Sequence, residues 1–356
     1  MRIFRYAAAV LILGVIAAYL SVYAPYRGFR QPVILEFPKG TSAQSMASEL
    51  ARNGVIRYPW QFLVARAAHP GKRLQAGEYR FDRPDTAANI LNRIGRGDVF
   101  YYELVVPEGS NIFDIAALVG RFDFLNAGEF LRAARNPRLI HDVAPQAPSL
   151  EGYLFPATYR LTRSTTVAQL CEMMTGQFRR QWRDLVGASH TRPTNEIVTL
   201  ASMVEKETGR PEERPVVASV YENRLHRGMA LDCDPTTIYA ALLDDRYRGT
   251  IYRSDLDSDN AYNTYRHAGL PPGPIANPGR ASLQAALTPA ETDYLYFVAK
   301  PDGSGAHQFS ETVEQHNLAV QKYRRGNRPP DPPPQPAAKP EAPEKRRRGK
   351  KHTRAA

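Results

Sequence analysis

The amino-acid sequence predicts an α+β fold, and three observations lead to that prediction. Residues 33–37 and 77–81 have the alternating pattern of short strands. Several longer segments, such as residues 194–208, carry apolar side chains at helical spacing. A nearly unbroken apolar run covers residues 6–24. We therefore expect one N-terminal transmembrane helix followed by a small and a larger α+β domain.

Composition narrows the class of protein. The 356 residues suffice for two domains, and the formal net charge is +11. Residues 327–356 hold nine Lys or Arg and only three acids, so most of this charge is local. The rest of the chain is mildly basic, and we expect no nucleic-acid partner. Cys171 and Cys233 lack metal or redox spacing, which favours buried or free thiols over a disulfide.

The N-terminal segment predicts a membrane anchor. About twenty residues at 1.5 Å rise can cross a hydrocarbon core of about 30 Å, which suggests a transmembrane helix over residues 6–26. Arg2 and Arg5 favour a cytoplasmic N-terminus, residues 1–5, and tyrosines follow at the far interface. A cleaved signal peptide is the alternative. Either way, we expect the chain after about residue 27 to lie outside the cytoplasm.

Residues 32–100 combine strands, Pro/Gly turns and capped helices. A strand at 33–37 is followed by a helix at 43–53 with Thr41 or Ser42 as its cap, and a strand at 77–81 precedes a helix at 86–94. The pattern resembles a LysM-like glycan-binding module. A plain spacer domain is the alternative interpretation.

The segment 150–159 is rich in aromatic residues. It contains Glu151, Tyr153, Phe155 and Tyr159. Rings that stack on sugar faces and carboxylates that bind hydroxyl groups would suit a glycan groove, so Glu151 and Tyr153 are candidate substrate-binding residues. The same aromatic residues could instead belong to a core strand.

Residues 194–208 predict a helix with two glutamates at the edges of its apolar face. We expect Thr194 to cap it, and at about 100° per residue Glu205 and Glu207 fall on opposite borders of that face. Partial burial raises the pKa of a carboxyl group, which a general acid needs near neutral pH. Helical spacing does not choose between the two, and solvated helix-edge glutamates remain the alternative. Asp234 is expected to act as a helix cap.

The loop 261–278 is too rich in Pro and Gly for regular structure. It could form a rigid rim that presents Tyr262, Asn263 and Tyr265 to a sugar, or these residues could be scaffolding. A strand at 294–299, a partner near residue 308 and a helix at 312–324 are expected after it.

Ordered motifs across residues 30–325 resemble the endolytic murein transglycosylases, the MltG or YceG-like family. The motifs are Glu151-Gly152-Tyr153-Leu154-Phe155-Pro156, Ala201-Ser202-Met203-Val204-Glu205-Lys206-Glu207-Thr208, Asn223-Arg224-Leu225, Asp234-Pro235-Thr236, Tyr262-Asn263-Thr264-Tyr265, Gly269-Leu270-Pro271-Pro272-Gly273-Pro274-Ile275 and His316-Asn317. Ala157 and Asp232 depart from the family pattern, where an aspartate and a glutamine are usual.

The resemblance implies a catalytic domain at residues 101–326 with Glu205 as its catalytic residue. It implies cleavage of the MurNAc-β-1,4-GlcNAc bond of peptidoglycan to leave 1,6-anhydroMurNAc ends, which would terminate nascent strands, without cofactor or metal. The implied location is the bacterial inner membrane, single-pass, with the catalytic domain periplasmic and peptidoglycan synthases as candidate partners. A non-catalytic peptidoglycan-binding scaffold and a hydrolase are the alternatives.

The Pro-rich, basic residues 327–356 have the composition of a disordered tail. Such a tail could bind anionic lipid or wall polymer, or simply aid solubility.

Overall fold

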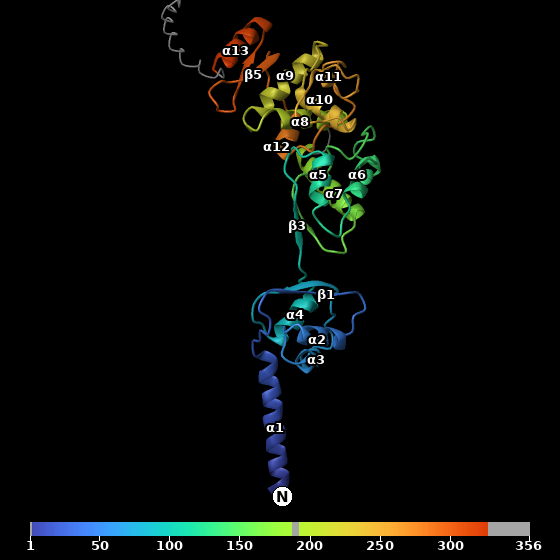
Figure 1. Cartoon of the computed structure of the whole chain (residues 1–356), viewed down its shortest axis with the longest axis vertical. Coiled ribbons are helices and arrows are strands. Elements are labelled where there is room, and N and C mark those ends of the chain that lie inside the picture. Colours follow the sequence, from blue (N-terminus) through green and yellow to red (C-terminus); the bar gives the residue numbers. More distant parts are fainter. Residues whose placement is uncertain (1, 187–191, 327–356) are drawn as a thin grey trace, which may run out of the picture. The chain divides into compact units, whose positions relative to one another are not determined.

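The computed structural model describes residues 2–186 and 192–326, and the tail expected at 327–356 lies outside them. The described chain is α+β, as predicted, and divides into two units at Leu295–Tyr296. Figure 1 labels most of the elements. In chain order they are α1 (Arg2–Tyr23), β1 (Val33–Phe37), α2 (Ala43–Arg52), α3 (Pro59–Ala67), β2 (Gly77–Phe81), α4 (Ala87–Arg96), β3 (Tyr102–Val105), α5 (Ile112–Val119), α6 (Ala127–Ala134), the 3-10 helix η1 (Pro137–Ile140), β4 (Thr158–Leu161), α7 (Val167–Val186), α8 (Thr194–Glu207), α9 (Arg214–His226), α10 (Asp234–Leu243), α11 (Arg253–Leu256), α12 (Arg280–Leu287), β5 (Tyr296–Ala299), β6 (His307–Ser310) and α13 (Val313–Gly326).

Helix α1 differs from the expected membrane span. Within the described residues, no helix combines the length and the apolar character needed to cross a membrane. The helix ends at Tyr23 rather than at residue 26, and its last turn packs against protein. Val22 is buried, and the side-chain amide of Gln61 donates a hydrogen bond to the carbonyl oxygen of Ser21 at 3.0 Å. Because of these contacts with α3 and α4, a shorter part of the apolar run is free of contact with the rest of the protein.

The module after α1 pairs β1 with β2 antiparallel, Val33 opposite Phe81. Helices α2, α3 and α4 and these two strands share one hydrophobic core. The predicted strands and both predicted helices are present, and Ser42 and Thr86 cap the helices with their side chains. Helix α3 was not predicted.

The next segment begins with a long-range strand pair. Strand β3 pairs antiparallel with β4, Leu104 opposite Tyr159, although more than fifty residues separate them. Helix α5 follows β3 and is capped by Asn111. Helix α7 buries Phe178 and Trp182 among others, and Figure 1 shows α5, α6 and α7 lying together.

Helix α8 lies at the centre of the helical part of the first unit. It is buried from Thr194 to Val204 except at Glu196, and it packs against α9, α10 and α12 (Figure 1). Pro193 is the cap residue and Thr194 the first helical residue, one position from the prediction. The same shift holds for α10, where Cys233 is the cap and Asp234 the first residue. Both cysteines are buried and free.

The second unit contains the predicted β5–β6 hairpin and helix α13. Phe297 pairs with Phe309 in the antiparallel register, and the ring of Tyr296 stacks on His316 of α13 with centroids 5.2 Å apart.

Candidate active site

Glu205 lies in the last turn of α8, and both of its carboxylate oxygens accept hydrogen bonds. Its side chain is only 6% exposed. Oε1 accepts a hydrogen bond from Nη2 of Arg214 at 3.0 Å, and Oε2 accepts one from the backbone N–H of Gly279 at 2.9 Å. Charge-assisted bonds of this kind are stronger than neutral ones. The carboxylate therefore has a fixed orientation, which acid/base chemistry requires.

Two neighbouring helices supply these donors. Arg214 is the first residue of α9 and is itself 9% exposed. Gly279 caps the N-terminus of α12, a helix packed against α8. The N-terminus of a helix carries unpaired N–H groups and a partial positive charge, which favours a nearby anion. The packing of three helices thus assembles the binding pocket of one carboxylate.

A second carboxylate, Glu108, adjoins this group. Its Oε2 lies 3.8 Å from Nη2 of Arg214, so one guanidinium serves both acids, and its side chain is 51% exposed. Burial and the charge of Glu205 raise the pKa of Glu108, while Arg214 acts in the opposite direction. Glu108 follows β3 in the turn that leads to α5. The sequence patterns predicted no role for Glu108, Arg214 or Gly279.

The turn that carries Glu108 is attached to the end of α8. Gly109 has φ +74°, and the side-chain amine of Lys206 donates to its carbonyl oxygen at 3.2 Å. A β-carbon on Gly109 would lie 3.5 Å from Cγ of Glu205. That distance is an ordinary contact, so the left-handed backbone is what favours glycine here.

Glu207 lies in a different environment. Its Oε1 accepts hydrogen bonds from the hydroxyl of Tyr221 at 2.9 Å and from the thiol of Cys233 at 3.2 Å. Tyr221 and Cys233 are buried, and burial raises the pKa of each well above its usual value. Glu207 therefore belongs to an internal network that joins α8, α9 and the start of α10.

Glu151 and Tyr153, the two candidate substrate contacts in the aromatic segment, are fully buried. Glu151 accepts from the backbone N–H of Ile112 at 2.8 Å and from the side-chain amide of Asn277 at 2.7 Å. Burial raises its pKa to about 8. Tyr153 donates its hydroxyl to Asn195 at 2.9 Å. Because neither side chain has exposed surface, their position does not fit the predicted direct contact with glycan and favours a structural role.

The three candidates in the loop 261–278 differ in exposure. Asn263 is fully buried, which fits scaffolding. Its side-chain amide donates to the backbone carbonyl oxygens of Asp255, Leu256 and Ser258. Tyr262 is half-buried, with its ring 5.1 Å from that of Tyr239. Tyr265 is 38% exposed and donates its hydroxyl to Asp234 at 2.7 Å. Of the three, Tyr265 has the most surface available to a ligand.

The geometry defines a carboxylate-centred site suited to acid/base chemistry, and comparison with known proteins identifies the family. The sequence model of the YceG-like family matches residues 35–322. An endolytic murein transglycosylase of Bacillus subtilis (strain 168) is 31% identical over 310 residues, which cover 82% of this chain and 84% of the relative. One of Streptococcus pneumoniae serotype 2 (strain D39 / NCTC 7466) is 27% identical over 327 residues, which cover 82% of this chain and 58% of the relative. A crystal structure of a YceG-like protein from Listeria monocytogenes superposes with a TM-score of 0.54 at 30% identity, and the match covers 81% of this chain and 99% of the other.

The chain belongs to the YceG-like family.

Proposed function

We propose that this chain is an endolytic murein transglycosylase in which the Glu205 carboxyl is the acid/base group. Relatives similar to it over most of its length carry that name. The observation that carries the proposal is the geometry of Glu205, a 6% exposed carboxylate with one oxygen on Arg214 and the other on the N–H of Gly279. An ordinary helix-edge glutamate needs neither partner.

The proposed reaction needs no water. Protonated Glu205 gives its proton to the oxygen that joins C1 of N-acetylmuramic acid to C4 of N-acetylglucosamine, and the C1–O bond breaks. The 6-hydroxyl oxygen of the same muramic acid then bonds to C1, and its proton returns to Glu205. The products are a free 4-hydroxyl and a 1,6-anhydro end. Because the nucleophile belongs to the substrate, its proximity is already supplied, and one carboxyl group suffices.

The second carboxylate supports hydrolysis as a competing function. Ordinary glycosidases use two carboxyl groups, one as acid and one as base or nucleophile. Glu108 and Glu205 share Arg214, and Glu108 is the more exposed of the two. In the transglycosylase, Glu108 holds Arg214 in place and accepts a hydrogen bond from a sugar hydroxyl. In a hydrolase it would activate water and yield reducing ends.

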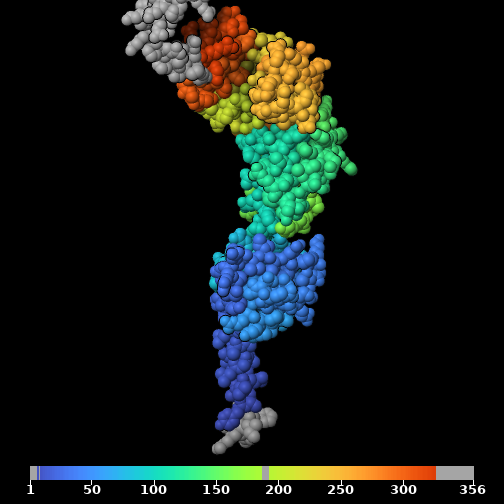
Figure 2. Space-filling model, viewed as in Figure 1, coloured from blue at the N-terminus to red at the C-terminus, as the bar shows by residue number. Residues whose placement is uncertain are grey.

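We further propose that the protein works on the cell wall from a membrane surface. Among the α1 side chains whose burial the structure describes, ten large apolar ones are exposed, from Tyr6 at 71% to Tyr23 at 48% (Figure 2, dark blue). Exposed apolar surface on this scale marks an interaction site, and lipid is the occupant that fits an apolar helix. The test is to follow the full chain and a variant lacking residues 2–20 in a vesicle flotation gradient. Flotation of both would refute attachment through α1.

The module of α2, α3, α4 and the β1–β2 pair is proposed to bind glycan in the LysM-like manner, with a spacer as the alternative. The enzyme would act where strands are made, ending nascent strands beside peptidoglycan synthases. Cross-linking in cells with a probe placed on the module would test the synthase contact, and recovery of no synthase would count against it.

The deciding experiment is mass spectrometry of purified peptidoglycan digested by the full chain. Anhydromuramyl ends are expected, and Glu205→Gln should lower their rate of formation by about 10²–10⁴-fold, the usual contribution of a general acid/base. Glu103→Gln, on the exposed side of β3 with 59% exposure, is the matched control and should leave the rate unchanged. Reducing ends would favour the hydrolase, and undigested glycan would favour a non-catalytic scaffold.

A further inference from the structure

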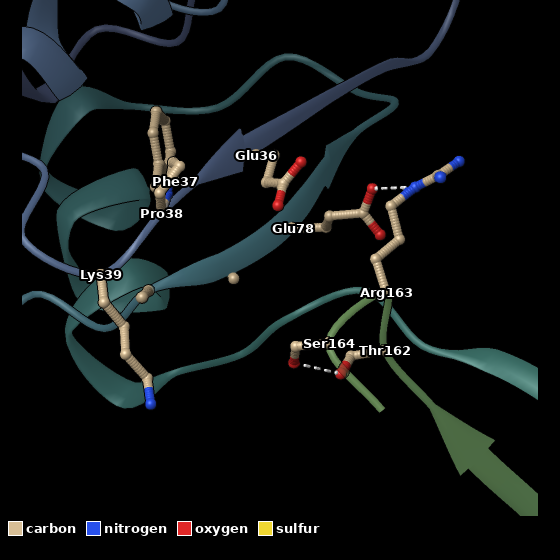
Figure 3. Close-up of a pocket in the computed structure, with 10 residues that line it drawn as sticks. Glu36, Phe37, Pro38, Lys39, Glu78, Thr162, Arg163 and Ser164 are labelled. Carbon is tan, nitrogen blue, oxygen red and sulfur yellow. Dashed lines mark hydrogen bonds and ion pairs between the residues drawn. The ribbon is translucent and has the colours of Figure 1, made fainter. Parts of the chain in front are cut away.

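A small pocket lies between the β1–β2 pair and the residues that follow β4 (Figure 3). Its volume is about 250 Å³. The pocket is separate from Glu205, and none of its lining residues takes part in the site described above. Polar side chains that line it are Glu36, Lys39, Glu78, Thr162, Arg163 and Ser164.

Glu78 is the residue that identifies this pocket as a candidate binding site. Its side chain is 7% exposed, and its Oε1 accepts a hydrogen bond from Nε of Arg163 at 2.9 Å. Its Oε2 is buried and makes no hydrogen bond of standard geometry among the described residues, although the hydroxyl of Tyr102 interacts with the same carboxyl group. A buried acceptor without a donor is costly, and more so when it is charged. Figure 3 shows this carboxyl group between strand β2 and Arg163, at the wall of the pocket.

The arrangement of charged groups around Glu78 would stabilise a further cation. Glu36 stands directly opposite Glu78 in the antiparallel register, and like charges in opposite positions are unfavourable. Arg163 is shared, since its Nη1 also binds Asp123 at 3.0 Å. Glu78 and Asp123 thus share the one guanidinium of Arg163. Lys39 is drawn at the other end of the pocket, where it extends away from Glu78 (Figure 3).

We propose that this pocket binds a primary ammonium group of the peptide that peptidoglycan carries. The ammonium donates to Oε2 of Glu78 and to Glu36, and a carboxylate of the same peptide residue pairs with Lys39. An ammonium fits better than a sugar hydroxyl because it supplies both charge and three donors. The volume is below the roughly 300–1,000 Å³ of sites for drug-sized ligands, which suits one amino-acid residue. The identity of the peptide's source depends on the proposed function, whereas the ammonium site does not.

A metal ion is the competing occupant of two neighbouring carboxylates. Over residues 2–186 and 192–326, no group of three or more His, Cys, Asp or Glu side chains could hold a metal ion. An organic cation requires only the two acceptors and the space that the pocket offers.

The test is calorimetric titration of the detergent-purified full chain with defined peptides in the presence of EDTA. The probes are the tripeptide L-Ala-γ-D-Glu-diaminopimelate, its lysine counterpart, the same peptides acetylated on the side-chain amine, and free lysine. We expect both tripeptides to bind, and acetylation to weaken binding at least tenfold. Equal binding of acetylated peptides, or no binding of the tripeptides, would overturn the ammonium site. Free lysine binding as tightly as the tripeptides would overturn the assignment to the wall peptide, and tight Ca²⁺ binding without EDTA would overturn the organic cation.

Two variants test whether the peptide binds in this pocket. Glu78→Gln keeps the shape and removes the charge, and Glu36→Gln changes an exposed residue. Each should weaken tripeptide binding at least tenfold, while Glu103→Gln should not. Unchanged binding in both pocket variants would overturn the proposal. These titrations involve no glycan cleavage, so a failure here and a failure of the transglycosylase assay are separate results.

Discussion

Replacing Gly279 by alanine tests whether the position of Glu108 beside Glu205 matters. The backbone N–H of residue 279 still donates to Glu205, and φ of −74° is open to alanine. The added β-carbon would lie 2.0 Å from Oε1 of Glu108 and 2.1 Å from its Cδ. Ordinary contact begins near 3.4 Å. The Glu108 carboxylate must therefore move by more than about 1 Å, while the donor to Glu205 is kept.

The structure sets the expected size of the effect. Glu108 is 51% exposed, so its side chain can swing toward solvent. Forcing a side chain off its rotamer costs about 0.5–1.5 kcal/mol, and the melting temperature should fall by only a few degrees. A displacement of about 1 Å in a catalytic group can cost about 10²-fold in rate. We therefore expect a 10- to 100-fold slower formation of anhydromuramyl ends in a protein of nearly normal stability.

The assay is a double-mutant cycle read by the rate of anhydromuramyl end formation. Gly279→Ala and Glu108→Ala should each slow the reaction, but in the Glu108→Ala background the alanine at 279 meets no carboxylate and should have no further effect. Gly176→Ala in α7 is the matched control, since its β-carbon would meet only a guanidinium nitrogen at 3.8 Å. Wild-type rate in Gly279→Ala, or additive losses in the double variant, would refute this account of Glu108.

Three further predictions concern the carboxylates. Arg214→Gln leaves the 6% exposed Glu205 with one backbone donor, so the free energy of unfolding measured in urea should fall by about 3 kcal/mol and digestion should slow. An unchanged urea midpoint would show that Arg214 is not needed. Glu207→Gln should retain more activity than Glu205→Gln in the mass-spectrometric assay, because Glu207 binds Tyr221 inside the protein; equal losses would contradict the assignment. Burial raises the pKa of Glu151 from 4.5 to about 8, so its contribution to stability is complete below pH 4.5 and is lost as the pH rises to about 8. The slope is at most about 1.4 kcal/mol per pH unit, and Glu151→Gln should flatten it in unfolding curves measured across that range.

Local elements were predictable from the sequence because their determinants are close in the chain. The strands at 33–37 and 77–81 follow from side-chain patterns, and the helices after Ser42 and Thr86 follow from capping residues next to amphipathic segments. The pairing of β3 with β4 was not predictable, because it depends on packing between distant segments. The predicted transmembrane helix ended at residue 26, beyond the end of α1 at Tyr23, for a related reason. Contacts of Val22 with the module are tertiary and leave no mark in the hydropathy pattern.

The choice between Glu205 and Glu207 shows the same limit at the site. Helical spacing places both at the edge of one apolar face, and the family resemblance, rather than geometry, selected Glu205. The structure separates them by their partners. Glu205 is bound by Arg214, nine residues away, and by Gly279, seventy-four residues away, whereas Glu207 is bound by Tyr221 and by a buried thiol. A partner so distant in the chain cannot be inferred from the periodicity of one helix.

Glu151 shows how a motif can matter to the site without touching the ligand. Its two oxygens join the start of α5, through the N–H of Ile112, to the segment before α12, through Asn277. The backbone N–H of Gly109 also donates to the carbonyl oxygen of Asn277, at 3.0 Å. These are the two segments that bring Glu108 and Gly279 to Glu205. A carboxyl group with no exposed surface therefore fixes the distance between the second carboxylate and the backbone donor of the first, and its substitution should disturb the site through that distance.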